Sequence, residues 1–207
     1  MNRAIFLAVT LLATVITNLT ATGARAEGAA AKAILAGGCF WCLEHDLREL
    51  PGVTNAVSGY SGGSMAHPTY ETYHNVSTEN PVPHVEVVEV TYDTSKLSYD
   101  GLLDYFYRHI DPTDGGGQFC DRGPAYRPVI YYANDAEKAA AEAKQAEVGK
   151  LIGVPSAVEV LPAKTFWPAE EYHQQYAAKN PVQYKYYRWG CGRDQRVAKV
   201  WSKAAAK

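Results

Sequence analysis

Four cysteines are the residues best suited to chemistry in this chain of 207 residues, and Cys39 and Cys42 lie in the short segment Gly-Gly-Cys-Phe-Trp-Cys. An apolar run at 33–36 precedes the segment and leucines at helical spacing follow it, so Cys39 is expected where a strand ends and a helix begins. Unpaired N–H groups and the helix dipole favour an anion there, and the thiolate is the nucleophilic form of cysteine. The segment therefore predicts an easily ionised, solvent-open thiol at Cys39.

The neighbours of Cys39 predict a small apolar pocket at this thiol. Phe40 and Trp41 follow it directly, and two large aromatic side chains beside a nucleophile suggest a receptor for an apolar group. Gly37 and Gly38 precede it and are expected to keep the backbone open to an approaching substrate.

The spacing of Cys39 and Cys42 also fits other chemistry. A C-x-x-C pair at a helix start is typical of thioredoxin-like redox enzymes. A c-type haem site is excluded, because its motif requires His where this chain has Leu43. His45 is nearby, but the chain has no second C-x-x-C and no spaced pair of histidines to complete a zinc site. We expect neither a metal nor an organic cofactor.

Glu86 is the second candidate for chemistry. It lies in the predicted strand 84–93, on the face that it shares with Val88 and Val90. A carboxyl group among valines is either at a solvated face or partly buried with a raised pKa. The pattern alone leaves both possibilities open.

The rest of the chain predicts alternating strands and helices around these residues. Strands are predicted at 33–36, 53–58, 84–93, 129–132 and 157–160, with helices at about 39–50, 98–110 and 135–150. The polar segment 64–83 is predicted to be an ordered surface loop. The first six elements follow the β-α-β-β-α-β order of ferredoxin-like α+β folds. Beyond residue 160 we expect a long irregular C-terminal segment that frays at 203–207.

The first 26 residues have the pattern of a secretory signal peptide. A short positive region at 1–3 precedes an apolar, uncharged run at 4–16, and Ala24-Arg25-Ala26 has the small-x-small form of a cleavage site. The apolar run is too short for a comfortable membrane span, although an uncleaved anchor is the alternative. We therefore expect one domain at 27–207, exported to the periplasm or secreted, without stable membrane association after cleavage.

Composition restricts the partners of this domain. The whole chain has a formal net charge of −2, and removal of Arg3 and Arg25 with the leader changes it to −4, which does not favour nucleic acid. Export implies an oxidising compartment, yet four cysteines are few for a disulfide-stapled scaffold. The cysteines are therefore expected to have a chemical role, and we expect a monomer.

Several motifs together resemble the A-type peptide methionine sulfoxide reductases. The family motif Gly-Cys-Phe-Trp is present at 38–41, and its His-x-Glu strand motif matches His84-Val85-Glu86. Its Pro-Thr-Tyr matches 68–70, and its Asp-x-Gly-x-x-Tyr-Arg matches 121–127. The resemblance covers about residues 33–201 and implies a two-layer α/β roll with the ferredoxin-like core. It implies that Cys39 attacks the sulfoxide sulfur, Glu86 protonates the oxygen, and Phe40, Trp41, Tyr70, Asp121 and Tyr126 bind the substrate.

The resemblance also implies how the thiol is regenerated. A cysteine near the C-terminus commonly resolves the sulfenic acid in the family, which favours Cys191 in the tail. Cys42 replaces the glycine of other members and is the alternative resolving thiol, whereas Cys120 is expected to be a buried thiol near the pocket. The expected substrate is methionine S-sulfoxide, free or in proteins. A thioredoxin-like dithiol is expected to reset the disulfide.

Two other functions remain open on the sequence. A thiol–disulfide oxidoreductase would use Cys39 and Cys42 as its redox pair. A secreted binding module would use the aromatic C-terminal region to recognise ligands and would turn over no methionine sulfoxide.

Overall fold

The computed structural model describes residues 29–205, and the predicted leader at 1–26 lies outside these residues. A six-stranded sheet in the order β7-β6-β1-β3-β2-β8 forms one layer. All neighbouring strands are antiparallel except β6 and β7, which are parallel. The strands are β1 (Ala30–Ala36), β2 (Val53–Ser61), β3 (Val85–Asp93), β6 (Val129–Tyr132), β7 (Glu159–Pro162) and β8 (Trp167–Pro168).

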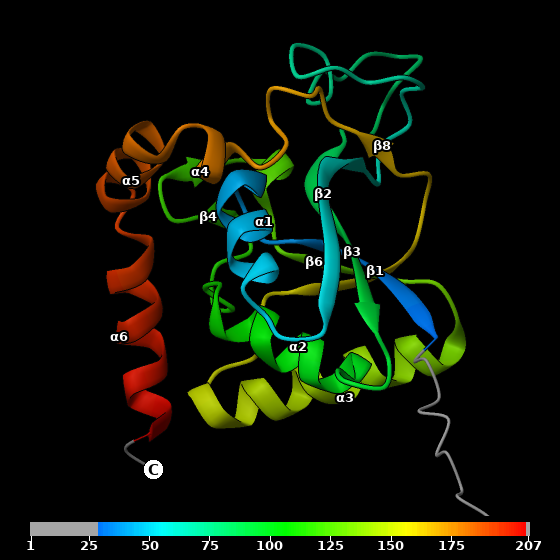
Figure 1. Cartoon of the computed structure of the whole chain (residues 1–207). Coiled ribbons are helices and arrows are strands. Elements are labelled where there is room, and N and C mark those ends of the chain that lie inside the picture. The colour runs from blue at the N-terminus through cyan, green and yellow to red at the C-terminus, as the bar shows by residue number, and fades with distance from the viewer. Residues whose placement is uncertain (1–28, 206–207) are drawn as a thin grey trace, which may run out of the picture.

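The core of the fold has the predicted ferredoxin-like topology. Helix α1 (Phe40–Arg48) connects β1 to β2, and helix α2 (Tyr99–Arg108) connects β3 to β6. In space these four strands lie in the order β6-β1-β3-β2, which is the arrangement of two interleaved β-α-β units. Helix α3 (Asp135–Ile152) then leads into β7, and Figure 1 shows α2 and α3 side by side below the sheet. The fold class predicted from the sequence is confirmed.

The central strand β3 separates a large hydrophobic cluster from a small one. Val88, Val90 and Tyr92 belong to the large cluster, which includes the buried leucines of α1 and α2. Val85 and Val87 belong to the small cluster on the other face, which Leu161 and Phe166 help to cover. Glu86 shares the face of Val88 and is buried, so its carboxyl group lies beneath the helical layer.

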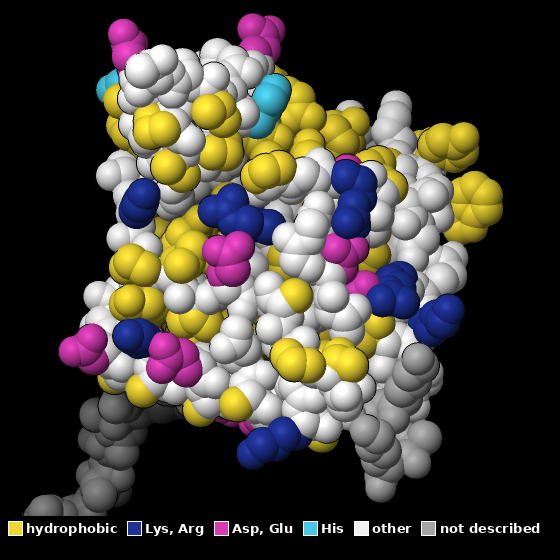
Figure 2. Space-filling model, turned by 180° about the vertical axis from the view of Figure 1, so that it is seen from behind, with side chains coloured by type: hydrophobic (Ala, Val, Ile, Leu, Met, Phe, Trp, Pro, Cys, Tyr) yellow, Lys and Arg dark blue, Asp and Glu magenta, His cyan; other side chains and the backbone are white. Residues whose placement is uncertain are grey.

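A long connection between β2 and β3 carries residues 62–84 over one end of the sheet. His84 anchors it, because its Nδ1 accepts a hydrogen bond from Gly63 N at 3.2 Å and its Nε2 lies 2.7 Å from the carbonyl oxygen of Met65. The connection forms a lobe at the top of Figure 1, and Figure 2 shows hydrophobic side chains on the surface of this lobe. It is an ordered loop, as predicted.

The C-terminal segment differs from the prediction. It is irregular only as far as Gln175, and three helices follow: α4 (Tyr176–Lys179), α5 (Pro181–Gly190) and α6 (Arg193–Ala205). Pro181 occupies the first turn of α5, where its fixed φ suits a helix and its missing N–H costs nothing. Figure 1 shows α4, α5 and α6 running down the side of α1 and α2. Within the described residues, none of the helices is both long and apolar enough to cross a membrane.

A small two-stranded hairpin completes the structure near the N-terminus of α1. Its strands are β4 (Gly117–Gln118) and β5 (Asp121–Arg122), and the short 3-10 helix η1 (Pro124–Tyr126) follows directly. Phe119 at the tip has φ of 57°, a left-handed backbone conformation that closes the tight turn. Cys120 and Asp121 are thereby brought to the same end of the sheet as α1.

Candidate active site

Cys39 lies at the N-cap of α1, two glycines after the end of β1, as the sequence predicts. The two preceding glycines serve packing rather than substrate access. A Cβ on Gly37 would lie 2.7 Å from Cγ2 of Ile110, and a Cβ on Gly38 would lie 2.5 Å from Cβ of Gln118. Gly38 also has φ of +78°, which disfavours any other residue. The glycines therefore let the Cys39 turn lie against α2 and the hairpin.

The Cys39 thiol is less accessible than predicted. The residue is only 7% exposed, and its thiol contacts the thiol of Cys42 and the hydroxyl of Tyr187. Burial raises the pKa of Cys39 well above its usual value, and the contact with Cys42 and the nearby Glu86 add to the rise. The expectation of a solvent-open thiol is wrong, and burial opposes the ionisation of Cys39.

The Glu86 carboxyl group faces the start of α1. Its Oε2 accepts a hydrogen bond of 2.9 Å from the backbone N–H of Phe40, one of the orphan donors of the helix. Its Oε1 accepts a bond of 3.0 Å from the hydroxyl of Tyr73. Burial raises the pKa of Glu86 to about 8, although both hydrogen bonds lower it. Glu86 is therefore protonated at neutral pH and can donate a proton.

Cys39 and Glu86 line one small cavity of about 70 Å³. The cavity walls contain seven of the residues predicted from the sequence, together with Tyr187: Cys39, Phe40, Trp41, Tyr70, Glu86, Asp121, Tyr126 and Tyr187. Two aromatic rings supply an apolar side, whereas the carboxyl and hydroxyl groups supply a polar side. Such a cavity suits a small group with an apolar end and a hydrogen-bond acceptor next to it.

The site contains two tyrosines, Tyr73 and Tyr187, that the sequence does not predict. The hydroxyl of Tyr73 contacts Glu86 and lies 3.2 Å from the hydroxyl of Tyr126. The hydroxyl of Tyr187 donates to Oδ2 of Asp121 and also contacts the Cys39 thiol. Burial raises the pKa of Asp121, and the bond from Tyr187 opposes that rise. The chain has 15 tyrosines, and no local pattern distinguishes these two from the structural ones.

The C-terminal segment fixes the apolar side of the cavity. The indole of Trp41 stacks on Tyr176 with ring centroids 3.7 Å apart, and its Nε1 donates to Nδ1 of His173 at 3.0 Å. Burial lowers the pKa of His173, which keeps the imidazole neutral and Nδ1 available as an acceptor. The buried Glu44 binds the backbone N–H of Gln175 with both carboxylate oxygens, at 3.1 and 3.0 Å, and so holds the start of α4.

Two of the cysteines form a disulfide that the sequence does not predict. Cys191 forms a disulfide with Cys120, with Cα atoms 4.9 Å apart, so it does not lie beside Cys39 as a free thiol. Cys120 is exposed, because it lies at the tip of the hairpin, and the expectation of a buried thiol is wrong. Cys39 and Cys42 are the free cysteines of the described residues, and both are buried.

Two arginines, Arg188 and Arg193, lie near Cys42. Arg188 donates to Oδ1 of Asp46 at 2.7 Å, and Nε of the buried Arg193 lies 3.5 Å from Oδ2 of the same carboxylate. The hydrogen bond from Cys39 lowers the pKa of Cys42, and the charges of Arg193 and Arg188 lower it further. Of the two neighbouring thiols, Cys42 is thus the one whose thiolate the protein stabilises.

Metal ligands do not gather at this cavity in the part of the chain that the structure describes. The group of potential ligands found there is Cys120, Asp121 and Cys191, and the disulfide already uses both of its sulfur atoms.

Comparison with known proteins points to one family. The model of the family "Peptide methionine sulfoxide reductase" matches residues 31–205. A protein of Caulobacter vibrioides named peptide methionine sulfoxide reductase MsrA 2 is 47% identical over 88% of this chain and 93% of its own length. A protein of the same name from Rhizobium meliloti is 46% identical over 84% of both chains.

Solved structures show the same fold. Mxr1 of Saccharomyces cerevisiae in its reduced form matches with a TM-score of 0.65 and 30% identity, over 76% of this chain and 88% of Mxr1. Methionine sulfoxide reductase A of Corynebacterium diphtheriae matches with a TM-score of 0.61 and 29% identity, over 74% of this chain and 76% of its own.

Proposed function

This chain belongs to the peptide methionine sulfoxide reductase family, and from that premise we propose that Cys39 and Glu86 together reduce methionine sulfoxide. The chain is an oxidoreductase of the A type, as its relatives are. The observation that supports the assignment of roles is the cavity of about 70 Å³, which holds the one thiol and the one protonated carboxyl group that the reaction needs.

The first step transfers the sulfoxide oxygen. Protonated Glu86 donates a hydrogen bond and then its proton to the oxygen, while the Cys39 sulfur attacks the sulfoxide sulfur. A bond between the two sulfur atoms forms transiently. As the oxygen moves to the Cys39 sulfur, this bond and the sulfur–oxygen bond of the substrate both break, and Cys39 becomes a sulfenic acid. Two electrons of the Cys39 sulfur reduce the substrate to the thioether methionine. Cys39 loses its own proton to solvent before the attack, and Glu86 takes up a proton from solvent after it has given its own.

The cavity walls orient the substrate for this attack. Phe40 and Trp41 form the apolar side and receive the methyl group on sulfur. Tyr126 and Tyr70 line the cavity beside Glu86, where their hydroxyl groups help to hold the oxygen. Asp121 fixes Tyr187 against the Cys39 thiol. Because Trp41 is stacked and hydrogen-bonded, the apolar side is preorganised rather than formed on binding.

Cys42 is the thiol that the geometry offers for the second step. It already contacts Cys39, whereas Cys191 is bound to Cys120. The Cys42 thiolate attacks the sulfenic sulfur of Cys39, a disulfide forms between them, and the hydroxyl group takes up a proton from solvent and leaves as water. Arg188 and Arg193 favour the thiolate of Cys42 and hence this attack.

An external dithiol closes the cycle. By exchange it converts the Cys39–Cys42 disulfide to two thiols and becomes a disulfide itself. A thioredoxin-like protein is our proposed donor, and a solved structure of the yeast protein Mxr1 is of its complex with Trx2. The proposed substrate is the S epimer, free or within proteins.

Thiol–disulfide exchange is the weaker candidate for the main activity. Cys39 and Cys42 would serve it as a redox pair, but the cavity at Cys39 also contains Glu86, Phe40 and Trp41, which thiol–disulfide exchange does not need. For the cellular site we propose export through residues 1–26, with the mature enzyme acting as a monomer in the periplasm or outside the cell.

Methionine release tests the proposed function. The purified enzyme is incubated with methionine S-sulfoxide and dithiothreitol, and methionine is quantified by chromatography. We expect turnover by the wild type and none by Cys39→Ser. Cys42→Ser should still release one methionine per chain in a single turnover and leave Cys39 as a sulfenic acid that a dimedone probe captures. An inactive wild type would overturn the function, and an active Cys39→Ser would overturn the assigned nucleophile.

A further inference from the structure

A second, larger cavity lies next to the catalytic one. It has a volume of about 550 Å³ and shares Tyr70 and Tyr126 with the cavity that holds Cys39. Tyr73, whose hydroxyl contacts Glu86, lines it as well. A molecule that places one group at Cys39 can therefore extend past these tyrosines into the larger space. We call this space the flank groove.

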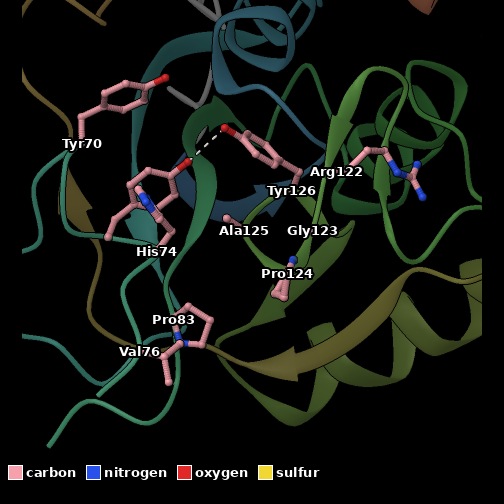
Figure 3. Close-up of a pocket in the computed structure, with 10 residues that line it drawn as sticks. Tyr70, His74, Val76, Pro83, Arg122, Gly123, Pro124, Ala125 and Tyr126 are labelled. Carbon is pink, nitrogen blue, oxygen red and sulfur yellow. Dashed lines mark hydrogen bonds between the residues drawn. The ribbon is translucent and has the colours of Figure 1, made fainter.

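Two segments form the walls of the flank groove. Figure 3 shows Tyr70, His74, Val76 and Pro83 on one side and the segment from Gly123 to Tyr126 on the other. The first wall belongs to the connection between β2 and β3, and the second contains η1. His84 anchors the first wall through its bonds to Gly63 and Met65, so the groove exists before anything binds.

The chemistry of the walls favours an apolar, uncharged group. Val76 is 63% exposed, and Pro83, Pro124 and Ala125 add further apolar surface. The two prolines have no backbone N–H, so this part of the groove offers few donors to a ligand. A Cβ at Gly123 would meet no atom within 4 Å, which shows that the space beside the second wall is open.

Arg122 is the one lysine or arginine in the lining of the groove, and an aspartate already neutralises it. Arg122 pairs with Asp114, and Figure 3 shows its side chain directed away from the opening between the walls. The lining contains no carboxylate. The groove therefore provides little electrostatic stabilisation for a charged ligand, and burying a charge against valine and proline is costly.

We propose that the flank groove binds an apolar side chain within two residues of the methionine sulfoxide in a peptide substrate. This inference rests on the proposed function, because it takes the position of the sulfoxide from the Cys39 cavity. An extended peptide advances about 3.3 Å per residue, so neighbouring residues enter the groove beyond Tyr70 and Tyr126. The preferred substrates are then oxidised methionines in exposed, flexible chain segments with an aliphatic or aromatic neighbour.

A peptide series tests the preference. The host is an acetylated, amidated pentapeptide with methionine S-sulfoxide between glycines, and leucine or aspartate replaces one glycine at a time. We expect leucine to raise kcat/KM about tenfold over the host at one or two of the four positions, through apolar contact, and aspartate to give no gain. The favoured positions reveal the direction in which the peptide runs.

Two matched variants show where the preference resides. Val76→Asp places a charge in the groove and should reduce the leucine-to-host ratio to near one, and Val76→Ala should reduce it part of the way. Val154→Asp makes the same change at a valine that is 47% exposed and lies outside both cavities, so the ratio should stay at the wild-type value. A ratio within one variant is independent of the amount of active enzyme.

The outcomes separate the two levels of the proposal. If neither free methionine S-sulfoxide nor the host peptide is reduced, the proposed function fails. If the host is reduced but leucine gives no gain at any position, or Val76→Asp keeps the full gain, the flank groove is not a substrate subsite.

Discussion

Glu86 is the single residue on which the chemistry depends most, because it must be an acid at neutral pH. Its carboxyl group is buried, and the raised pKa of about 8 follows from the loss of water. Cys39 also has a raised pKa, partly because of Glu86. The reactive form needs a thiolate and a carboxylic acid at once, so the two groups must share one proton.

This sharing predicts the pH dependence of the reaction. Below about pH 8 both groups are protonated, and the reactive form increases with pH until Glu86 begins to ionise. We expect kcat/KM to rise about tenfold per pH unit and to level off near pH 8. Glu86→Gln should lower kcat/KM by about 10² to 10⁴. The break, which is the change of slope near pH 8, should also disappear, because the rate of this variant should follow only the ionisation of the Cys39 thiol. An unchanged break in Glu86→Gln would show that another group titrates there.

The same burial makes Glu86 costly for stability. Its pKa is raised from 4.5 in the unfolded chain to about 8 in the folded one. The free energy of unfolding is therefore unaffected by this group below pH 4.5, and it falls as the pH rises from 4.5 to 8. Glu86→Gln should therefore become more stable than the wild type by about 1.4 kcal/mol per pH unit across that window, as urea unfolding can measure. Glu89→Gln, on the other face of β3 and paired with Lys32 at the surface, is the control. A gap that stays constant with pH would contradict the assignment.

Tyr73 and Tyr70 predict different results from the same substitution. The hydroxyl of Tyr73 bonds to Glu86 and lowers its pKa, so Tyr73→Phe should move the break in kcat/KM above pH 8. The hydroxyl of Tyr70 forms no hydrogen bond to Glu86 in the part of the chain that the structure describes, so Tyr70→Phe should leave the break in place. Equal shifts in both variants would show that the hydrogen bond is not the cause.

At the scale of elements, α5 covers the start of α1. It brings Tyr187 to Cys39 and Arg188 to Asp46, and it ends at Cys191 in the disulfide with the hairpin. The sequence does not predict this helix, because large hydrophobic residues occur on both its exposed and its buried face. Val182, Tyr186 and Trp189 are 76%, 75% and 69% exposed, whereas Tyr184 is buried. The residues of α5 therefore show no amphipathic pattern. Tertiary contacts with α1 determine which face of α5 is covered.

The Cys120–Cys191 disulfide is expected to stabilise the fold more than it serves the first turnover. It closes a loop with a sequence separation of 71, which corresponds to about 4 kcal/mol from the restricted unfolded chain. The double variant Cys120→Ser, Cys191→Ser should lose about that much unfolding free energy in urea. It should still release one methionine per chain without reductant. In that turnover the variant should also form the Cys39–Cys42 disulfide. A Cys39 that stays a sulfenic acid in the folded variant would return the resolving role to Cys191.

At the scale of the molecule, the strand order and the face of β3 follow from the sequence, but the site depends on contacts that it does not show. The motif at 38–41 locates the thiol, and alternation in β3 places Glu86 with the valines. Burial of both groups depends on the hairpin, the β2–β3 connection and α5 meeting over them. The pairing of Cys120 with Cys191 arises in the same way, since the two are 71 positions apart in the sequence.

Export is a prediction for the whole chain. Expression in a bacterium with a functional secretion pathway should yield a periplasmic or secreted protein that begins at Glu27, which intact mass and N-terminal sequencing would detect. Ala24→Asp and Ala26→Asp should block cleavage, because the cleavage site requires small residues at these positions. Full-length protein retained in the cytoplasm would contradict the assignment of 1–26 as a leader.

The most direct test of the account is a single turnover without reductant on enzyme whose Cys120–Cys191 disulfide is intact. Free thiols and methionine are counted before and after methionine S-sulfoxide is added, and peptide mapping identifies any new disulfide. The account predicts two free thiols before and none after, one methionine per chain, and a Cys39–Cys42 disulfide. Methionine formed while both thiols remain free, or a new disulfide without Cys39, would contradict it.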